Sequence, residues 1–412
     1  WVGIALILAS YAFISKDNMW PGYLALIPVL GAYLVIIANR SGSVITDNIV
    51  MQKVGLWSYS IYLWHWPISM MFKYLDLSGL NNITYGIILS VLFGYFSYKY
   101  VEKKIFIVKN GNIKRVLLSP VAYIYVLIAI YGVYIYKLNG FEERLPEDYR
   151  KIESNIKMPL VNNGYCFYSV DSIPYLKVGK GLNCHLGDKK SKNNILLFGD
   201  SYAGQYEPFW GRIAKEEKLN IQSITTNFCY PSLTDNFPTP QNSRSLKQCL
   251  INREYVLKNI NKYDTIIVSG MVSANSKALS EMIDFIKFAN KKGKKVIIMP
   301  VPKGYDYNFI RRFEVSWLSG LSDFNISKVP FLNDKNKEKA NEILSDFAKK
   351  NPENIFINRS DIFKGDYFLV DGVNIPYSLD GGHISIAGSL QAAKNIKASN
   401  KYKMIIDKIN NS

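Results

Sequence analysis

A serine, a histidine and an aspartate lie in two short motifs with the residue types of a hydroxyl nucleophile and its base. The motifs are Gly199-Asp200-Ser201 and Asp380-Gly381-Gly382-His383. A serine hydroxyl is a weak nucleophile until a general base removes its proton. The chain has three histidines, and His383 follows an aspartate at a spacing that lets a carboxylate orient the imidazole and stabilise its charged form. The motifs predict covalent catalysis by Ser201.

The residues around Ser201 predict a strand, a turn and a helix. The apolar run 194–198 is bounded by polar residues, as in a buried strand. Residues 202–218 predict a helix with one apolar face, made of Tyr206, Phe209, Trp210 and Ile213. We therefore expect Ser201 at the carboxyl end of a strand, where backbone N–H groups at the helix start can stabilise an oxyanion.

These motifs resemble the first and last blocks of the SGNH (GDSL-like) esterase and acyltransferase superfamily, which are Gly-Asp-Ser and Asp-x-x-His in that order. The resemblance implies that Ser201 is the nucleophile, His383 the base and Asp380 its orienter. Gly-Asp-Ser alone also occurs in ordinary turns. The agreement of strand, turn, helix and the distant Asp-x-x-His favours the catalytic interpretation.

The residues expected to donate hydrogen bonds to the oxyanion differ from the superfamily pattern. That pattern supplies the N–H of the nucleophile, a glycine after the second strand and an asparagine in Gly-x-Asn after the third. Here the corresponding stretches are 227–231, without glycine, and Gly270-Met271-Val272. Both departures resemble the membrane-fused subgroup. The N–H of Ser201 is the expected donor, with Asn275 and Asn227 as candidates that also suit ordinary turns.

The second half of the chain alternates strand and helix patterns. This alternation predicts an α/β SGNH-type domain, a parallel sheet with helices on both faces, over 161–412 after a polar linker at 138–160. Tyr202, Gln205 and Tyr377 flank the motifs and suit either an acceptor groove or packing, and His185 is given no role. The expected strands are 194–198, 221–226, 265–270, 295–300 and 355–358.

The first part of the chain, 1–137, contains apolar segments close to the ~20 residues that span a bilayer. The chain begins with Trp1, so we expect it to be the carboxyl-terminal part of a longer protein. Lysine and arginine in 101–115 predict a cytoplasmic loop there, which places everything after about 138 outside. The segments are Trp1–Ser15, Gly22–Ala38, Val54–Met71, Ile83–Tyr100 and Val116–Tyr136.

Two stretches resemble the end of the acyltransferase family 3 membrane domain, Ser58–Pro67 with its Ser-Tyr-Ser-x-Tyr-Leu-x-His-x-Pro pattern and Val101–Lys104. Similar members carry one further helix and a fused extracytoplasmic SGNH domain. The resemblance therefore implies about five helices of a partial membrane module. The family's proposed catalytic histidine and arginines lie on preceding helices, so we interpret His65 as a positional residue.

The cysteines and the net charge limit which functions and compartments suit the chain. Cys166, Cys184, Cys229 and Cys249 lack zinc-site spacing, and no metal site is expected. Their even number predicts two disulfides in an oxidising compartment, with the sequence-local pairs preferred and reduced buried thiols as the alternative. The net charge of +17 suits an acidic glycan or anionic lipid, or reflects a general bias towards lysine. No nucleic-acid motif is present.

The resemblance implies an O-acyltransferase, in particular an O-acetyltransferase, in the bacterial inner membrane with a periplasmic SGNH domain. Its acceptor would be a polysaccharide such as lipopolysaccharide O-antigen. Acetyl-CoA would be the cytoplasmic donor for the full-length protein, and the SGNH domain would bind no cofactor. The alternatives are a membrane-anchored carbohydrate esterase, a peptidoglycan O-acetyltransferase, and a catalytically silent glycan-binding domain.

Overall fold

The computed structural model describes residues 1–14, 22–40, 42–75, 77, 79–103, 120–141, 143, 147, 150, 155–305, 334–370 and 373–410. The chain forms two compact units, Trp1–Gly132 and Val133–Ser412. The basic loop expected at 101–115 lies almost entirely outside the described residues.

The first unit consists of apolar helices that pack in pairs. Helix α1 contacts α2 where Gly3 and Gly31 meet, because a Cβ on Gly3 would lie 2.5 Å from the Gly31 carbonyl oxygen. Helix α3 contacts α4 where Gly94 meets the backbone of Ile61. The elements are α1 (Val2–Phe13), η1 (Tyr23–Ala25), α2 (Leu26–Ala38), α3 (Ile49–Tyr74), α4 (Leu80–Ser97), the π-helical turn η2 (Tyr98–Glu102) and α7 (Pro120–Lys137).

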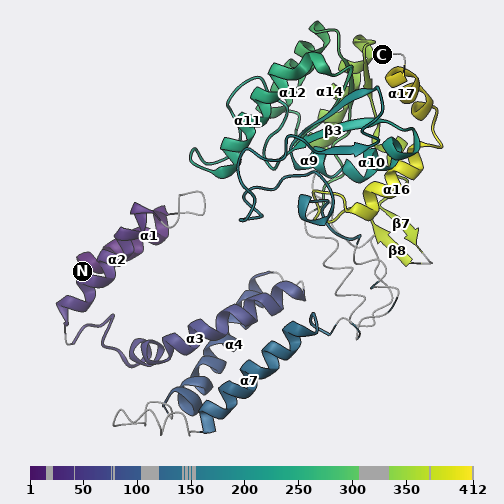
Figure 1. The fold of residues 1–412 in the computed structure, drawn as a ribbon. Helices are drawn as coiled ribbons and strands as arrows, with labels where there is room; N and C mark the ends of the chain where they lie inside the picture. The colour runs from purple at the N-terminus through teal and green to yellow at the C-terminus, as the bar shows by residue number, and fades with distance from the viewer. Residues whose placement is uncertain are drawn as a thin grey trace. The chain divides into compact units, whose positions relative to one another are not determined.

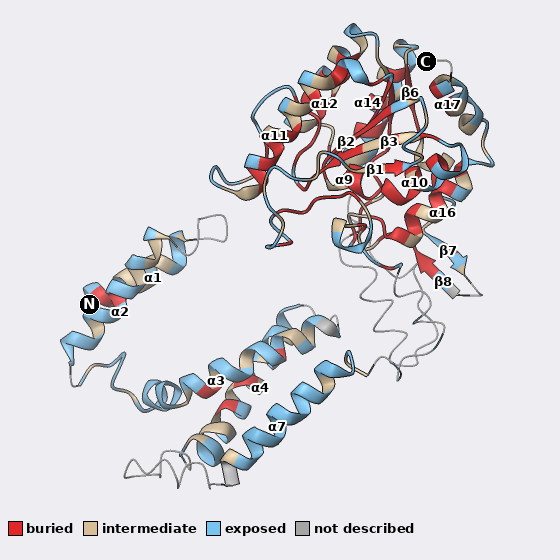
Figure 2. Cartoon of the chain, viewed as in Figure 1, coloured by how far each residue is buried: buried red, intermediate tan, exposed pale blue. Residues whose placement is uncertain are grey.

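Among the described residues one helix, Leu80–Glu102, is long and apolar enough to cross a bilayer, and Val2–Phe13, Tyr23–Ala38 and Ala122–Lys137 are shorter apolar helices. Many of their apolar side chains are exposed (Figure 2). Such surfaces are typical of helices that lipid or further helices cover. Nδ1 of His65 contacts the carbonyl oxygen of Tyr62 in its own helix, and Ser60 donates to Glu102 (2.9 Å), which joins the two stretches that resemble the family 3 domain.

The second unit is built on a six-stranded sheet of order β1-β3-β2-β4-β5-β6, with helices on both sides (Figure 1). Its parallel strands are β2 (Asn194–Gly199), β3 (Asn220–Thr225), β4 (Thr265–Ser269), β5 (Lys295–Ile298) and β6 (Asn354–Phe356). These are the five strands expected from the sequence. The edge strand β1 (His185–Gly187) pairs antiparallel with β3 and was not predicted.

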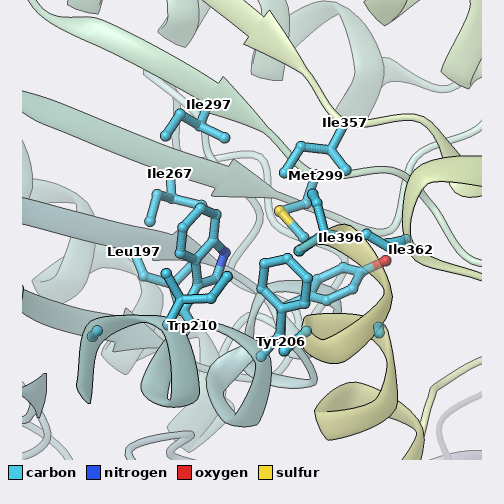
Figure 3. Packing of buried hydrophobic residues seen from close by; sticks show 14 of the residues in the cluster. Leu197, Tyr206, Trp210, Ile267, Ile297, Met299, Ile357, Ile362 and Ile396 are labelled. Carbon is cyan, nitrogen blue, oxygen red and sulfur yellow. The ribbon is translucent and has the colours of Figure 1, made fainter. Parts of the chain in front are cut away.

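Alternate residues of each strand face opposite layers of the core. Leu197, Ile267 and Ile297 pack against one set of helices (Figure 3), whereas Leu196 and Phe198 pack against the other. The first layer contains α10 (Glu207–Glu216), α15 (Arg359–Ile362), α16 (Ile386–Ile396) and α17 (Asn400–Asn410). The second contains α11 (Arg244–Asn259), α12 (Lys277–Lys291) and α14 (Lys335–Lys350). The remaining elements are η4 (Val161–Asn163), η5 (Ile260–Lys262) and the hairpin β7 (Tyr367–Val370) and β8 (Val373–Pro376).

The single helix expected over 202–218 is wrong. The structure has a short helix, α9 (Ser201–Gly204), and a separate helix α10 that begins at Glu207. Pro208 explains the break, because proline is tolerated in the first turn of a helix but clashes with the preceding turn inside one. The expected apolar face is nevertheless correct, since Tyr206, Phe209, Trp210 and Ile213 are buried.

The chain has two disulfides, Cys166–Cys184 and Cys229–Cys249, as the preferred pairing predicted, and the second joins the loop after β3 to α11. Beside the first of them lies Glu207, whose carboxylate is fully buried. It accepts hydrogen bonds from the backbone N–H groups of Cys166 (2.6 Å) and Phe167 (3.0 Å) and from the hydroxyls of Ser223 and Thr225. Burial raises the pKa of Glu207 to about 6, although these hydrogen bonds oppose the shift.

The raised pKa of Glu207 predicts that the contribution of this carboxyl to the stability of the fold decreases as pH rises. Between pH ~4.5 and ~6 the folded state keeps a proton that the unfolded state has released, so stability falls by about 2 kcal/mol through that window. Glu207→Gln should reduce this pH dependence, because an amide can accept from the two N–H groups and donate to the two hydroxyls. Urea midpoints from pulse proteolysis at pH 4 and pH 7 provide the measurement.

Glu207→Leu is the matched control, because it leaves four buried polar groups without their partner and should cost several kcal/mol at both pH values. A Glu207→Gln protein with an unchanged pH dependence would contradict this account of the buried carboxylate.

Candidate active site

Ser201 is the first residue of α9, directly after the turn that follows β2 at the carboxyl edge of the sheet. The turn requires Gly199, because a Cβ there would lie 2.0 Å from the carbonyl oxygen of Ser269 on the neighbouring strand. Asp200 caps α9 by accepting from the backbone N–H of Tyr202 (2.8 Å). No hydrogen bond from the backbone N–H of Ser201 occurs among the described residues, which leaves this donor available to a ligand.

His383 and Asp380 lie in a tight loop between β8 and α16. Gly381 has φ 83°, a left-handed conformation that favours glycine. The loop is closed by the N–H of Leu379, which donates to the carbonyl oxygen of His383 (2.7 Å). Oδ1 of Asp380 accepts from the backbone N–H groups of Gly382 (2.8 Å) and His383 (2.6 Å).

The two motifs meet in a continuous hydrogen-bond path. Nδ1 of His383 lies 2.7 Å from Oδ2 of Asp380, and Nε2 lies 2.8 Å from Oγ of Ser201. With the proton on Nδ1, the imidazole donates to Asp380 and accepts from the serine hydroxyl. This is the tautomer that a general base requires.

Electrostatics keep Asp380 ionised. Burial opposes ionisation, but the hydrogen bonds from the His383 side chain and from the backbone of His383 and Gly382 outweigh it and lower the pKa of Asp380 to about 2. A carboxylate that stays charged can stabilise the imidazolium that forms when His383 takes a proton.

Two buried side chains hold the loops in register, and one of them, Gln205, is a residue that the sequence suggested for an acceptor groove or for packing. Oε1 of Gln205 accepts from the backbone N–H of Ile384 (2.9 Å), which ties the histidine loop to the segment after Ser201. Oδ2 of Asp200 accepts from the N–H of Met271 (2.8 Å), which ties the serine turn to the loop after β4. Burial raises the pKa of Asp200 to about 6. Gln205 flanks the serine motif, but its partner lies too far along the chain for local pattern to reveal it.

Ser201 opens into a cavity of about 780 Å³ that is also lined by Asp380 and His383. Asn227 lines it too and is 8% exposed. Its Oδ1 accepts from the N–H of Val170 (3.1 Å), whereas no described residue accepts from its Nδ2. Most of the remaining wall is apolar, with Met158, Leu160, Phe167, Phe228, Phe237, Met271 and Leu379.

The structure does not bring Asn275 to this cavity. It lies exposed in the turn before α12 and is not among the lining residues. Val272, at the position of the superfamily asparagine, is buried in the core. Tyr377 packs against Phe363 and Phe368, and His185 contacts Asn220 and Asn183, so neither faces Ser201. Among the described residues no cluster suits a metal ion.

Among curated proteins, none has a sequence that matches this chain. The periplasmic domain of a lipopolysaccharide acetyltransferase from Salmonella serovar Paratyphi A is similar at 18% identity, over 64% of this chain and 98% of that one, with a TM-score of 0.40. A structure of a putative acylhydrolase from Bacteroides fragilis is similar at 12% identity, over 54% and 90%, with a TM-score of 0.32. The family model of SGNH domains fused to AT3 domains matches residues 166–398, more than half of the chain, and the chain therefore belongs to that family.

Proposed function

We propose that the chain is an O-acyltransferase that esterifies an extracytoplasmic polysaccharide through an acyl ester on Ser201. The observation that carries the proposal is the hydrogen-bond path from Asp380 through His383 to Ser201, which opens into the cavity. Membership of a family in which the SGNH domain is fused to AT3 domains supports transfer to a sugar over hydrolysis, because the fusion partner is an acyltransferase module.

In the first step, Oγ of Ser201 attacks the carbonyl carbon of the acyl donor while its proton passes to Nε2 of His383. The Asp380 carboxylate stabilises the resulting imidazolium. Collapse of the tetrahedral intermediate breaks the bond to the leaving group, which takes the proton from Nε2. Ser201 then carries the acyl group as an ester.

In the second step, a sugar hydroxyl gives its proton to Nε2 of His383 and attacks the ester carbonyl. The intermediate collapses with Oγ of Ser201 as the leaving group, and Nε2 returns the proton to it. One acyl group has moved from donor to sugar, and the enzyme is unchanged. A covalent path of this kind divides a difficult transfer into two easier steps.

The oxyanion of both intermediates would be held by the backbone N–H of Ser201 and Nδ2 of Asn227. Both donors lie at the carboxyl ends of adjacent strands, and neither donates to a described residue. A donor that is already fixed in place stabilises the developing charge with little reorganisation. The hydrogen bond from the backbone N–H of Val170 to Oδ1 orients the Asn227 amide, which supports the oxyanion role that the sequence suggested for this residue.

We propose acetyl as the acyl group and acetyl-CoA as the cytoplasmic donor for the full-length protein, with no cofactor bound by the SGNH domain. The acceptor would be lipopolysaccharide O-antigen, and the protein would lie in the bacterial inner membrane with this domain in the periplasm. Both disulfides support an oxidising compartment. The apolar helices of the first unit support a membrane location.

Ser201→Ala should abolish acetylation of the surface glycan while the domain stays folded, because the hydroxyl contributes little packing. Acetyl ester content of purified glycan, measured by mass spectrometry in cells that make the full-length protein, tests this. Ser280→Ala, on the exposed face of α12, is the matched control and should have no effect. Near-normal acetylation in the Ser201→Ala strain would refute the proposal. Loss of acetyl groups from pre-acetylated glycan without transfer would identify an esterase instead.

Asp380→Asn should lower the rate on a small activated ester such as p-nitrophenyl acetate on the order of 10³- to 10⁴-fold. The amide oxygen can still accept from the backbone N–H groups of Gly382 and His383, so the loop is kept. The amide NH2 would face Nδ1 and favour the tautomer with the proton on Nε2, which cannot accept from Ser201. Steady-state kinetics with unchanged protease resistance provide the measurement, and a loss smaller than tenfold would contradict the role of Asp380.

A further inference from the structure

Phe228 is an aromatic residue in a conformation and position that packing does not explain. Its φ is 68°, in the left-handed region that side chains with a Cβ rarely adopt. Phe228 is 46% exposed and lines the cavity that contains Ser201. A strained residue persists when the surrounding structure holds it, and such residues gather at binding sites.

The turn that carries Phe228 is held on both sides. Before it, the carbonyl oxygen of Asn227 accepts from the buried hydroxyl of Ser245 (2.9 Å). After it, Cys229 is bonded to Cys249 and donates its N–H to the carbonyl oxygen of Thr226 (3.1 Å). These constraints fix the backbone while the ring remains open to the cavity.

Polar atoms suited to a sugar lie in the same cavity. Ser169 is 3% exposed and its hydroxyl contacts no described hydrogen-bond partner, and Ser172 lines the same cavity. The aromatic rings of Tyr230 and Phe237, 5.5 Å apart, extend the apolar wall next to Phe228. An apolar aromatic surface with a few hydroxyl partners matches the two faces of a pyranose ring, C–H groups on one side and hydroxyls at the rim.

Charge decides which sugars fit. Among the described lining residues the sole lysine or arginine is Lys277, and its Nζ lies 3.8 Å from the buried carboxylate of Glu281. Asp200 and Asp380 also line the cavity. Among the described lining residues an anionic sugar would meet the carboxylates of Asp200 and Asp380, and the one lysine already lies near the carboxylate of Glu281, in spite of the basic net charge of the chain.

We propose that Phe228 is the stacking platform of an acceptor subsite for a neutral pyranose, with the Ser169 hydroxyl as a hydrogen-bond partner. The inference deepens the proposed function and rests on it for the chemistry at Ser201. Two adjacent residues of one turn would then contact the two reactants: Asn227 would hold the oxyanion, and Phe228 would stack on the acceptor sugar.

The test measures binding without catalysis, in the full chain carrying Ser201→Ala. The probes are methyl α-rhamnopyranoside, which is neutral, and methyl α-glucopyranosiduronic acid, which is anionic at pH 7, each followed by saturation-transfer NMR. We expect the neutral glycoside to bind and the anionic one to bind at least tenfold more weakly. Phe228→Gly should weaken binding of the neutral glycoside about tenfold, and Phe228→Tyr should preserve it.

Phe228→Gly relieves the left-handed strain as it removes the ring, so a loss of binding in a protease-resistant protein reports the ring and not unfolding. Tyr175→Ala, an exposed aromatic residue outside the cavity lining, is the matched control and should bind as the parent does. Preference for the anionic glycoside, or unchanged binding in Phe228→Gly, would overturn the subsite. Binding as expected, together with near-normal glycan acetylation in cells that make the full-length protein with Ser201→Ala, would overturn the proposed function alone.

Discussion

The hydrogen bond from the backbone N–H of Ile384 to the buried carboxamide of Gln205 joins the two halves of the site. Ser201 and His383 come from segments far apart in the chain, and nothing local sets the 2.8 Å distance between them. Gln205 lies one turn beyond the serine, and Ile384 directly follows the histidine. This contact holds the histidine loop against the serine turn, together with the ring of Tyr202, which packs on His383 (4.9 Å between centroids).

Three buried carboxylates also accept hydrogen bonds from segments that are distant in the sequence. Asp200 holds the loop after β4, Glu207 holds the segment at Cys166, and Glu281 holds the wall at Ser232 and Thr234. Each costs desolvation free energy, visible in the raised pKa values of Asp200 and Glu207. Each recovers part of that cost through several hydrogen bonds, and each fixes a loop that lines the cavity. Burial of these carboxylates therefore lowers stability, while their hydrogen bonds fix the shape of the cavity.

Local pattern predicts the sheet and the serine turn well, because both depend on apolar periodicity and on residues adjacent in sequence. The strand 194–198, the glycine at 199 and the Asp-x-x-His spacing are all local. Gln205, Asp200 and Glu207 were missed as positioning residues because their partners lie on other strands or loops. The prediction of one long helix over 202–218 is wrong because the apolar periodicity continues across Pro208, whereas the helix itself does not. The sequence lacks the superfamily glycine after β3, but it does not reveal that Phe228 adopts a left-handed backbone conformation there.

The central claim is that Ser201 is activated by His383. The most direct measurement is covalent labelling of the chain by a fluorophosphonate, with the adduct located by peptide mass mapping and the labelling rate compared between the parent and His383→Gln. The account predicts one major adduct, on Ser201 rather than on Ser169 or Ser172 in the same cavity, and a labelling rate at least a hundredfold lower in His383→Gln. An adduct on another residue, or a rate that does not depend on His383, would contradict it.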